Sequence, residues 1–209
     1  MVCKGLRVAA LVAAAAVAQP SFAQDNASQG ATSENGTSFR GLRVEGNIGL
    51  DRFQSEGVHN DKLGYGGTIG FDGTIGDRIV IGAEGSFWRA NKWNENCQVL
   101  PDTNSICHKA FEEWGAAVRA GYLVTPDLLV FGKGGYVNGE QRRRIDSSTG
   151  TQLVYDHYRA DGYQLGGGVE YTLTHGSFPV YTNVQYVYSN YHGHSARQRL
   201  TAGIGIRFK

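Results

Sequence analysis

Apolar and polar residues alternate with a period of two along most of the chain after position 39. Near the start of this region the apolar or small positions are Leu42, Val44, Gly46, Ile48 and Leu50, and at its end they are Leu200, Ala202, Ile204, Ile206 and Phe208. Strict alternation over this length predicts β-strands. We expect eight strands, at about 40–52, 62–75, 78–90, 111–124, 128–141, 160–173, 179–191 and 197–208.

The connections between these strands alternate in length. Three are tight turns, at Gly76-Asp77, Thr125-Pro126-Asp127 and His175-Gly176-Ser177. The other four, at 53–61, 91–110, 142–159 and 192–196, are mostly much longer. Outer-membrane barrels have short periplasmic turns, longer outer loops and an even number of strands. The pattern therefore predicts an all-β fold, an eight-stranded antiparallel up-and-down transmembrane β-barrel.

The first residues have the pattern of a secretion signal. Lys4 and Arg7 precede an unbroken apolar run at 8–18, and the small residues Ser21 and Ala23 stand at the −3 and −1 positions of a cleavage site. The run is too short to cross a bilayer as a helix. We expect a signal peptide at 1–23, a flexible leader rich in Ser, Asn, Gln and Gly at 24–38, and the barrel at 39–209. These expectations place the protein in the outer membrane of a Gram-negative bacterium.

Composition indicates which face of the strands meets lipid. The chain has 30 Gly, 11 Tyr, 9 Phe and 3 Trp, which is high for a soluble domain of this size. Aromatic residues, which favour the two bilayer interfaces, gather near the predicted strand ends: Tyr65, Trp88, Trp114, Tyr163 and Tyr188 at one rim, and Phe71, Tyr122, Phe131, Tyr171, Tyr181 and Phe208 at the other. A soluble secreted barrel, with its apolar face inward, is the alternative.

The polar face combines glycine with ionic residues. Gly64, Gly66, Thr68 and Gly70 precede Asp72, and a similar series precedes Glu170. A narrow lumen that holds a few long charged side chains needs small neighbours. We expect an inward set of four acids and four bases, which consists of Arg43, Glu45, Asp72, Glu84, Arg119, Lys133, Glu170 and Arg207. Buried charges persist only when they are paired, so this set predicts an internal salt-bridge network.

Two cysteines remain after the predicted signal. Cys97 and Cys107 form an even pair in an exported chain, which favours a disulfide. The bond closes a short loop and contributes about 3 kcal/mol in the chain-entropy model. A metal site formed by the two cysteines and His108 is the weaker alternative, and we assign no cofactor, metal or catalytic residue.

Three stretches carry a resemblance to a known family. They are Gly121-Tyr122 together with 125–132 (TPDLLVFG), 166–171 (GGGVEY), and the last strand, which ends in Phe208. Over about 39–209 the chain resembles the small eight-stranded outer-membrane barrels, the OmpA-like and opacity-protein-like surface antigens. The resemblance implies that the terminal aromatic residue is read by the barrel-assembly machinery, although here Lys209 follows it.

The lumen of an eight-stranded barrel is just wide enough for side chains to fill it. We therefore expect a structural and surface-exposed protein that contributes to outer-membrane integrity and whose outer loops contact extracellular ligands. Its expected partners are outer-membrane lipid and lipopolysaccharide, with Arg142, Arg143 and Arg144 as candidate phosphate contacts. The formal net charge of +1 falls to −1 without Lys4 and Arg7, and nothing suggests a nucleic-acid partner.

Two other functions stay open at this point. A small pore for limited passive diffusion requires that the internal salt bridges open a narrow path. A membrane-embedded enzyme would use histidines near the outer rim, for which the candidates are His157, His192 and His194 with Asp156 or Asp161. The sequence shows no nucleophile at a convincing spacing from these groups.

Overall fold

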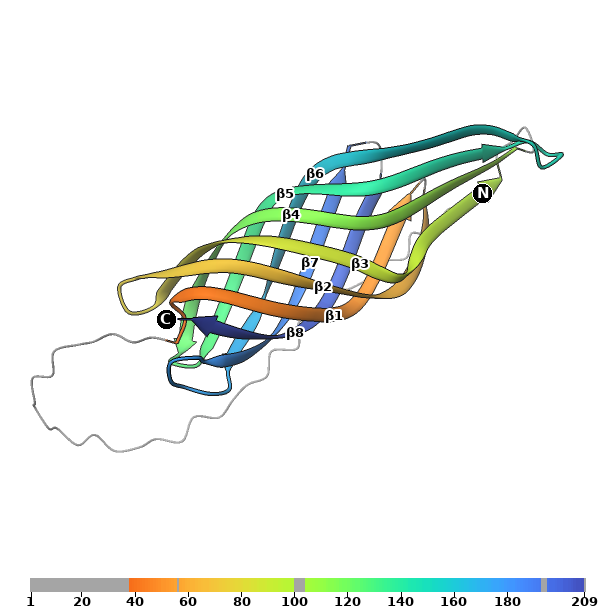
Figure 1. The fold of residues 1–209 in the computed structure, drawn as a ribbon. Coiled ribbons are helices and arrows are strands. Elements are labelled where there is room, and N and C mark those ends of the chain that lie inside the picture. Colours follow the sequence, from red (N-terminus) through yellow and green to blue (C-terminus); the bar gives the residue numbers. More distant parts are fainter. Residues whose placement is uncertain (1–37, 56, 100–103, 193–194, 209) are drawn as a thin grey trace, which may run out of the picture. The chain divides into compact units, whose positions relative to one another are not determined.

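The predicted segments are β-strands in the computed structural model, and they pair in chain order. The strands are β1 (Gly41–Ser55), β2 (Val58–Ile75), β3 (Ile79–Val99), β4 (Ser105–Thr125), β5 (Leu128–Asp146), β6 (Gln152–Thr172), β7 (Val180–Tyr191) and β8 (Ser195–Phe208). Each strand pairs antiparallel with the next, and β8 pairs with β1, so the described residues form a closed barrel (Figure 1). The predicted fold class is confirmed.

The structure describes residues 38–55, 57–99, 104–192 and 195–208. The chain divides into two units, Met1–Glu34 and Asn35–Lys209, and all described residues belong to the second. The predicted signal peptide and almost all of the predicted leader lie outside the described residues. No helix among the described residues is long and apolar enough to span a membrane.

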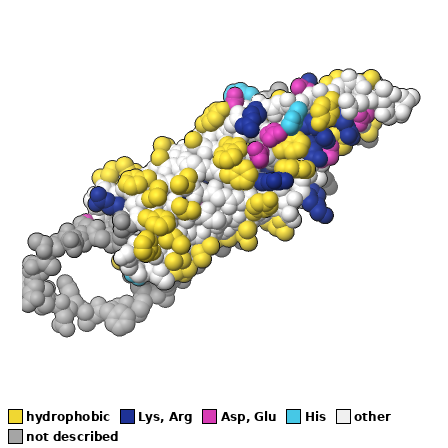
Figure 2. All heavy atoms as spheres, in the orientation of Figure 1, with side chains coloured by type: hydrophobic (Ala, Val, Ile, Leu, Met, Phe, Trp, Pro, Cys, Tyr) yellow, Lys and Arg dark blue, Asp and Glu magenta, His cyan; other side chains and the backbone are white. Residues whose placement is uncertain are grey.

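The period-two pattern sorts the side chains between the two faces of the barrel wall. On β1, Arg43 and Glu45 are buried in the lumen, whereas Val44 and Ile48 project outward and are 46% and 69% exposed. The outer surface is consequently apolar over the middle of the wall, and hydrophobic side chains cover much of the face drawn in Figure 2. An apolar outside around an ionic inside is the arrangement of a barrel that faces lipid.

The two ends of the barrel differ. We call the end that holds Gly41, Phe208 and the connections after β2, β4 and β6 the terminal end. We call the opposite end the hairpin end. At the terminal end Phe39, which precedes β1, is fully buried in an apolar floor with Val80, Leu123, Leu129 and Phe131. Ser38, at the end of the predicted leader, is also buried and lies 3.2 Å from the Thr172 hydroxyl.

Most of the predicted long loops are strand instead. Beyond the barrel, β3–β6 continue as a four-stranded sheet, which we call the projecting sheet (91–99, 105–112, 138–146 and 152–161). It reaches Val99, Ser105 and Asp146 before the chain turns (Figure 1). The predicted loops at 91–110 and 142–159, and the shorter one at 53–61, were therefore wrong. The sequence hides this sheet because both of its faces carry polar residues, and because bulges at Arg89/Asn94 and Ala110/Glu113 break the period.

Three predicted rim aromatics were also placed on the wrong face. Trp88, Phe131 and Tyr181 point into the lumen and are at most 6% exposed. Their partners explain this placement: the indole Nε1 of Trp88 donates to Asp51, and the hydroxyl of Tyr181 donates to Glu45. The remaining predicted rim aromatics except Tyr188 are exposed on the outside: Tyr65, Phe71, Trp114, Tyr122, Tyr163, Tyr171 and Phe208.

Candidate functional site

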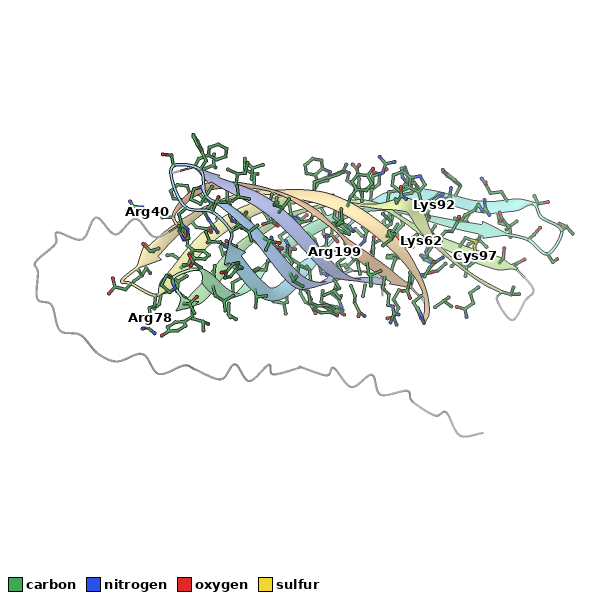
Figure 3. All side chains as sticks on the ribbon, turned by 90° about the horizontal axis from the view of Figure 1, so that it is seen from below. Arg40, Lys62, Arg78, Lys92, Cys97 and Arg199 are labelled. Atoms are coloured by element: carbon green, nitrogen blue, oxygen red, sulfur yellow. A yellow bond between two sulfur atoms is a disulfide. The ribbon has the colours of Figure 1, made fainter. Side chains whose placement is uncertain are left out.

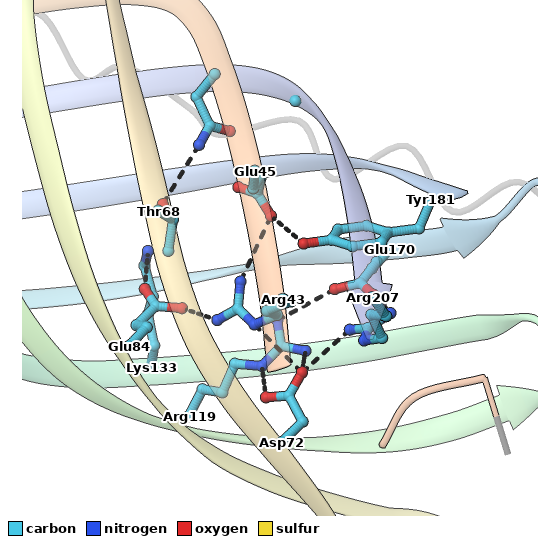
Figure 4. A network of polar contacts seen from close by, with 12 residues as sticks. Arg43, Glu45, Thr68, Asp72, Glu84, Arg119, Lys133, Glu170, Tyr181 and Arg207 are labelled. Carbon is cyan, nitrogen blue, oxygen red and sulfur yellow. Dashed lines mark hydrogen bonds and ion pairs between the residues drawn. The ribbon is translucent and has the colours of Figure 1, made fainter. Parts of the chain in front are cut away.

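Eight charged side chains fill the lumen toward the terminal end, and we call them the terminal cluster. Its members are the predicted inward residues Arg43, Glu45, Asp72, Glu84, Arg119, Lys133, Glu170 and Arg207, none of which is more than 9% exposed. They come from seven of the strands, β1 to β6 and β8, because each inward position of the period-two pattern points at the barrel axis (Figure 4).

Asp72 is the centre of the terminal cluster. Its carboxylate accepts hydrogen bonds from Arg119 Nη2 at 2.7 Å and Arg119 Nε at 2.9 Å, which is a bidentate pair. It also lies 3.2 Å from Arg43 Nε and accepts from Arg207 Nη2 at 3.1 Å. Three guanidinium groups therefore share one carboxylate. Neither the spacing of these residues in the sequence nor their number predicted this sharing.

The remaining acids of the terminal cluster complete the network. Glu84 accepts from Lys133 Nζ at 2.7 Å and also pairs with Arg43. Glu170 accepts from Arg119 Nη1 at 3.1 Å and pairs with Arg207, and Glu45 lies 3.5 Å from Arg43 Nη1. With four acids and four bases, the cluster has no formal net charge. This compensation allows the charges to stay ionised inside the lumen, where an isolated charge is costly.

A second group, which we call the hairpin cluster, lies in the lumen toward the opposite end. Asp51 and Arg197 form a bidentate pair, with Nη2 at 2.6 Å and Nε at 2.9 Å from the carboxylate oxygens. Glu113 forms an ion pair with Arg199 Nη2 at 2.6 Å and accepts a hydrogen bond from the hydroxyl of Tyr191. All four charged side chains are at most 5% exposed, so this cluster is buried and neutral as well.

The hairpin cluster was missed although the sequence contained its signal. Residues an even number of positions apart on one strand share a face, and we call this their parity. Asp51 shares the parity of Arg43 on the first strand, Glu113 shares that of Arg119, and Arg197 and Arg199 share that of Arg207. The same rule fixes Trp88, which is four residues from the inward Glu84. Extending each inward residue by steps of two would have found all of them.

Between the two clusters the lumen is lined mainly by uncharged polar groups. Asn47, Thr68, Gln164, Gln185 and Thr201 line a cavity of about 20 Å³, and Lys133 and Arg199 also belong to its lining. A cavity of this size holds about one water molecule. In the part of the chain that the structure describes, the path between the clusters is therefore filled.

Glycine makes room for the large inward side chains. A Cβ atom at Gly64 would lie 2.5 Å from the indole ring of Trp88, and one at Gly66 would lie 2.8 Å from it. A Cβ atom at Gly205 would collide with the ring of Tyr181. The glycine-rich polar face is thus the space that the lumen needs for its aromatic and ionic contents.

The projecting sheet carries the predicted disulfide pair and arginine run. Cys97 and Cys107 are directly opposite in the register of β3 and β4 and are joined by a bond between their sulfur atoms (Figure 3). Glu95 lies near both sulfurs, but these are already bonded to each other. Arg142, Arg143 and Arg144 lie 2.6, 3.8 and 2.9 Å from Glu95, Asp156 and Asp146 respectively.

The candidate histidines do not form one site. His157 Nε2 lies 2.8 Å from Glu140, and its ring packs 5.2 Å from that of Phe111. His192 Nδ1 lies 2.9 Å from the backbone oxygen of Asp161. His194 lies outside the described residues. Neither of the two described histidines has a serine or threonine hydroxyl among its hydrogen-bond partners in the described part of the chain.

Comparison with known proteins agrees with the geometry. The family model described as outer membrane protein beta-barrel domain matches residues 9–208. Ail of Yersinia pestis, solved with the heparin analogue sucrose octasulfate, is 15% identical, with a TM-score of 0.51 over 81% of this chain and 99% of Ail. Neisserial surface protein A is 13% identical, with a TM-score of 0.46 over 80% of this chain and 97% of that chain. No match was found among curated proteins.

Proposed function

Because the chain belongs to the outer membrane protein β-barrel domain family, we propose that it is a closed, surface-exposed barrel. In this proposal the wall contributes to the integrity of the outer membrane, and the projecting sheet presents a contact surface outside the cell. Residues 1–23 direct export, and the terminal end faces the periplasm. The barrel-assembly machinery inserts the chain.

The filled lumen is the observation that carries this proposal. Two neutral charge clusters span the interior, the cavity between them has the volume of about one water molecule, and Phe39 contributes to an apolar floor below them. Bulk solute has no continuous path through such an interior. The projecting sheet, by contrast, offers exposed side chains such as Leu153 and Tyr155 on a rigid support, which suits a contact surface.

Conductance across planar bilayers tests the closed lumen. We expect no steady single-channel current from the purified, refolded protein. The variant with Glu84→Gln and Arg119→Gln removes one charge of each sign from the terminal cluster, and the matched control Arg52→Gln with Asp61→Asn removes an exposed pair at the hairpin end. Steady current through the unmodified protein would overturn the proposal in favour of a small pore.

Migration of the outer-membrane fraction on an unboiled gel tests location and fold together. A folded barrel resists detergent and migrates differently before and after boiling. We expect this heat-modifiable band in the outer-membrane fraction. Recovery of the protein in the periplasm or the medium without detergent would instead support the soluble secreted barrel.

Contact with lipopolysaccharide phosphates is part of the proposed surface role. Arg142, Arg143 and Arg144 were its predicted carriers, and each lies beside a carboxylate. A phosphate would have to compete with those carboxylates for the same guanidinium groups. We therefore expect a small contribution from the arginine run.

A further inference from the structure

The two cysteines of the disulfide differ in their exposure to solvent. Cys97 is exposed, whereas Cys107 is 3% exposed. The strands explain the difference. In the described part of the chain the pairing of β3 with β2 stops at Ala90, so β3 forms an edge of the projecting sheet, whereas β4 lies between β3 and β5. Figure 3 shows Cys97 in the outer part of this sheet. A thiol in the surrounding water therefore meets the bond from the Cys97 side.

This difference decides how the bond reacts with a thiol. A thiolate breaks a disulfide by attacking one sulfur, and the other sulfur leaves as a thiolate. Attack on Cys97 is open to solvent, whereas attack on Cys107 is hindered by its burial. Exposed disulfides are also exchanged more readily than buried structural ones. Cys97 is consequently the sulfur that is attacked, and Cys107 is the leaving group.

A cation lies beside the leaving group. In the strand register Cys107 is directly opposite Arg144 of β5. Opposite residues of an antiparallel pair share a face, and their Cβ atoms are about 4.5–5.5 Å apart. Arg144 Nε lies 2.9 Å from Asp146, which holds the guanidinium group in place, and this group has further N–H donors for a second anion. A cation beside a sulfur stabilises its thiolate.

The acid nearest to the bond is itself neutralised. The carboxylate of Glu95 lies within 4.8 Å of both sulfur atoms, where its charge would disfavour a thiolate. However, it lies 2.6 Å from Arg142 Nη2 and 4.0 Å from Lys109 Nζ. Two cations therefore face this one carboxylate, and the surroundings of the disulfide do not oppose the formation of a thiolate.

The sheet keeps the two strands together when the bond opens. The register pairs β3 with β4 on both sides of Cys97, at 94–96 and at 98–99. The side-chain amide of Asn96 also donates to the backbone oxygen of Phe53 at 3.0 Å, which ties β3 to the hairpin of β1 and β2. The two sulfur positions thus stay adjacent after the bond opens, so the bond can form again.

We propose that Cys97 is a thiol–disulfide exchange site that captures thiol-bearing molecules outside the cell. The thiolate of the incoming molecule attacks Cys97 Sγ, a new S–S bond forms, and the bond between Cys97 and Cys107 breaks. Its electron pair stays on Cys107 Sγ, which leaves as a thiolate and takes a proton from water. Attack of Cys107 on the mixed disulfide reverses the capture, so no other oxidant or reductant is needed. Only the location outside the cell rests on the proposed function.

Trapping of the mixed disulfide tests the site. The full chain carries Cys3→Ser, so that Cys97 and Cys107 are its only cysteines. It is refolded and mixed with glutathione or with a peptide that contains one cysteine, acid stops the reaction, and mass spectrometry locates the adduct. We expect adducts on Cys97 about tenfold more often than on Cys107, or more. Reaction with glutathione alone assigns the site to small thiols, and reaction with both includes protein cysteines. Equal adducts on both cysteines, or no adduct, would overturn the proposal.

The rate of attack separates an exchange site from a structural disulfide. Dithiothreitol reports the first attack, because its second thiol completes the reduction. We expect the folded protein to be reduced at a rate within about tenfold of that of the protein unfolded in urea, since exposed bonds are the labile ones. A bond that opens only after unfolding would react about 1,000-fold more slowly or less, and this result would overturn the proposal.

The cation beside Cys107 has a matched control. Arg144→Gln removes it, whereas Arg143→Gln removes the same charge from the next position, which is opposite His108 on the other face of the sheet. We expect R144Q to slow reduction by dithiothreitol about threefold and R143Q to change it less than about 1.5-fold. Equal effects would overturn the assignment of Cys107 as the leaving group. Heat-modifiable migration is recorded for every variant. A folded barrel that does not exchange thiols contradicts this inference and leaves the proposed closed surface barrel intact.

Discussion

The terminal and hairpin clusters place the same ion types in the same lumen but connect them differently. In the terminal cluster one carboxylate, Asp72, serves Arg43, Arg119 and Arg207, so the eight charges form a single network. In the hairpin cluster Asp51 pairs with Arg197 while Glu113 pairs with Arg199. We therefore expect that the loss of any one charged residue strongly destabilises the terminal cluster. The hairpin cluster should tolerate the removal of a whole ion pair.

The largest effect is expected at the centre of the network. Asp72→Asn leaves three buried guanidinium groups without a shared counter-charge, and breaking a buried ion pair costs about 3–5 kcal/mol. We expect the free energy of unfolding, measured by urea titration of the refolded protein, to fall by at least that amount. Asp61→Asn, in the exposed pair with Arg52, should cost about 1 kcal/mol or less. A loss at Asp72 as small as that at Asp61 would contradict the network.

The apolar floor at the terminal end gives the next largest expected effect. Phe39 is fully buried, and the guanidinium carbon of Arg207 lies 4.9 Å from its ring. Phe39→Ala should lower the free energy of unfolding by about 3 kcal/mol, the usual cost of emptying a buried aromatic site. The matched variant is Phe178→Ala, because Phe178 is 63% exposed and its ring meets that of Phe208 edge-on. Similar urea midpoints for the two variants would show that the floor does not hold the ring tightly.

A double-mutant cycle compares the two clusters directly. We expect Asp51→Asn and Arg197→Gln each to destabilise the protein and their combination to recover part of the loss, with a coupling energy of about 1–3 kcal/mol. The equivalent cycle of Asp72→Asn with Arg119→Gln should recover less, because Arg43 and Arg207 still lack the Asp72 carboxylate. Equal recovery at both ends would remove the distinction between network and pair.

The smallest expected effect is the response of Asp161, in the projecting sheet, to a change of pH. Hydrogen bonds donated by Tyr136 and then Asn138 hold the pKa of Asp161 below its ordinary value of 3.8. A lowered folded pKa means that the contribution of this carboxylate to stability is complete above the ordinary pKa and disappears as pH falls through the lowered one. The side-chain amide resonances of Asn138 should therefore stay constant from pH 8 to 5. Movement centred near pH 6 would contradict this.

Most of the wall and one of the two clusters were predictable from the sequence, because one physical rule governs both. In a barrel between lipid and a narrow lumen, each strand keeps its apolar residues on the outer face. The alternation along the strand therefore predicts that Val44 faces outward and that Arg43 faces the lumen. The terminal cluster followed from that parity. The hairpin cluster obeys the same parity and was overlooked where Asp51 and Arg197 approach the strand ends.

The projecting sheet and the pairing pattern were beyond the sequence for physical reasons. Several buried positions of this sheet carry polar residues, such as Asn94, Asn96 and Gln141, so its strands show no period of two in hydrophobicity. Pairing depends on which inward side chains meet at one height, and that is set by strand register and by bulges such as the one between Arg89 and Asn94. Neither quantity can be obtained from spacing within one strand.

The placement of Trp88, Phe131 and Tyr181 shows how a general preference is overridden. Aromatic residues favour bilayer interfaces, yet Trp88 has a buried carboxylate to bind and glycines that make room for its ring. Parity with neighbouring inward residues was the better guide at these three positions. The same preference did hold for Trp114 and Tyr163, whose parity is outward.

The central claim is that the apolar face of the wall contacts lipid while the ions fill the inside. Nitroxide labels attached in place of Val118 and Ile204, which are 69% and 59% exposed, test it in reconstituted liposomes, with a label at Asp156 of the projecting sheet as the aqueous reference. We predict that both wall labels collide readily with dissolved oxygen and are shielded from a water-soluble paramagnetic complex, and that the Asp156 label behaves in the opposite way. Wall labels that respond to the water-soluble complex as strongly as the Asp156 label would contradict the account.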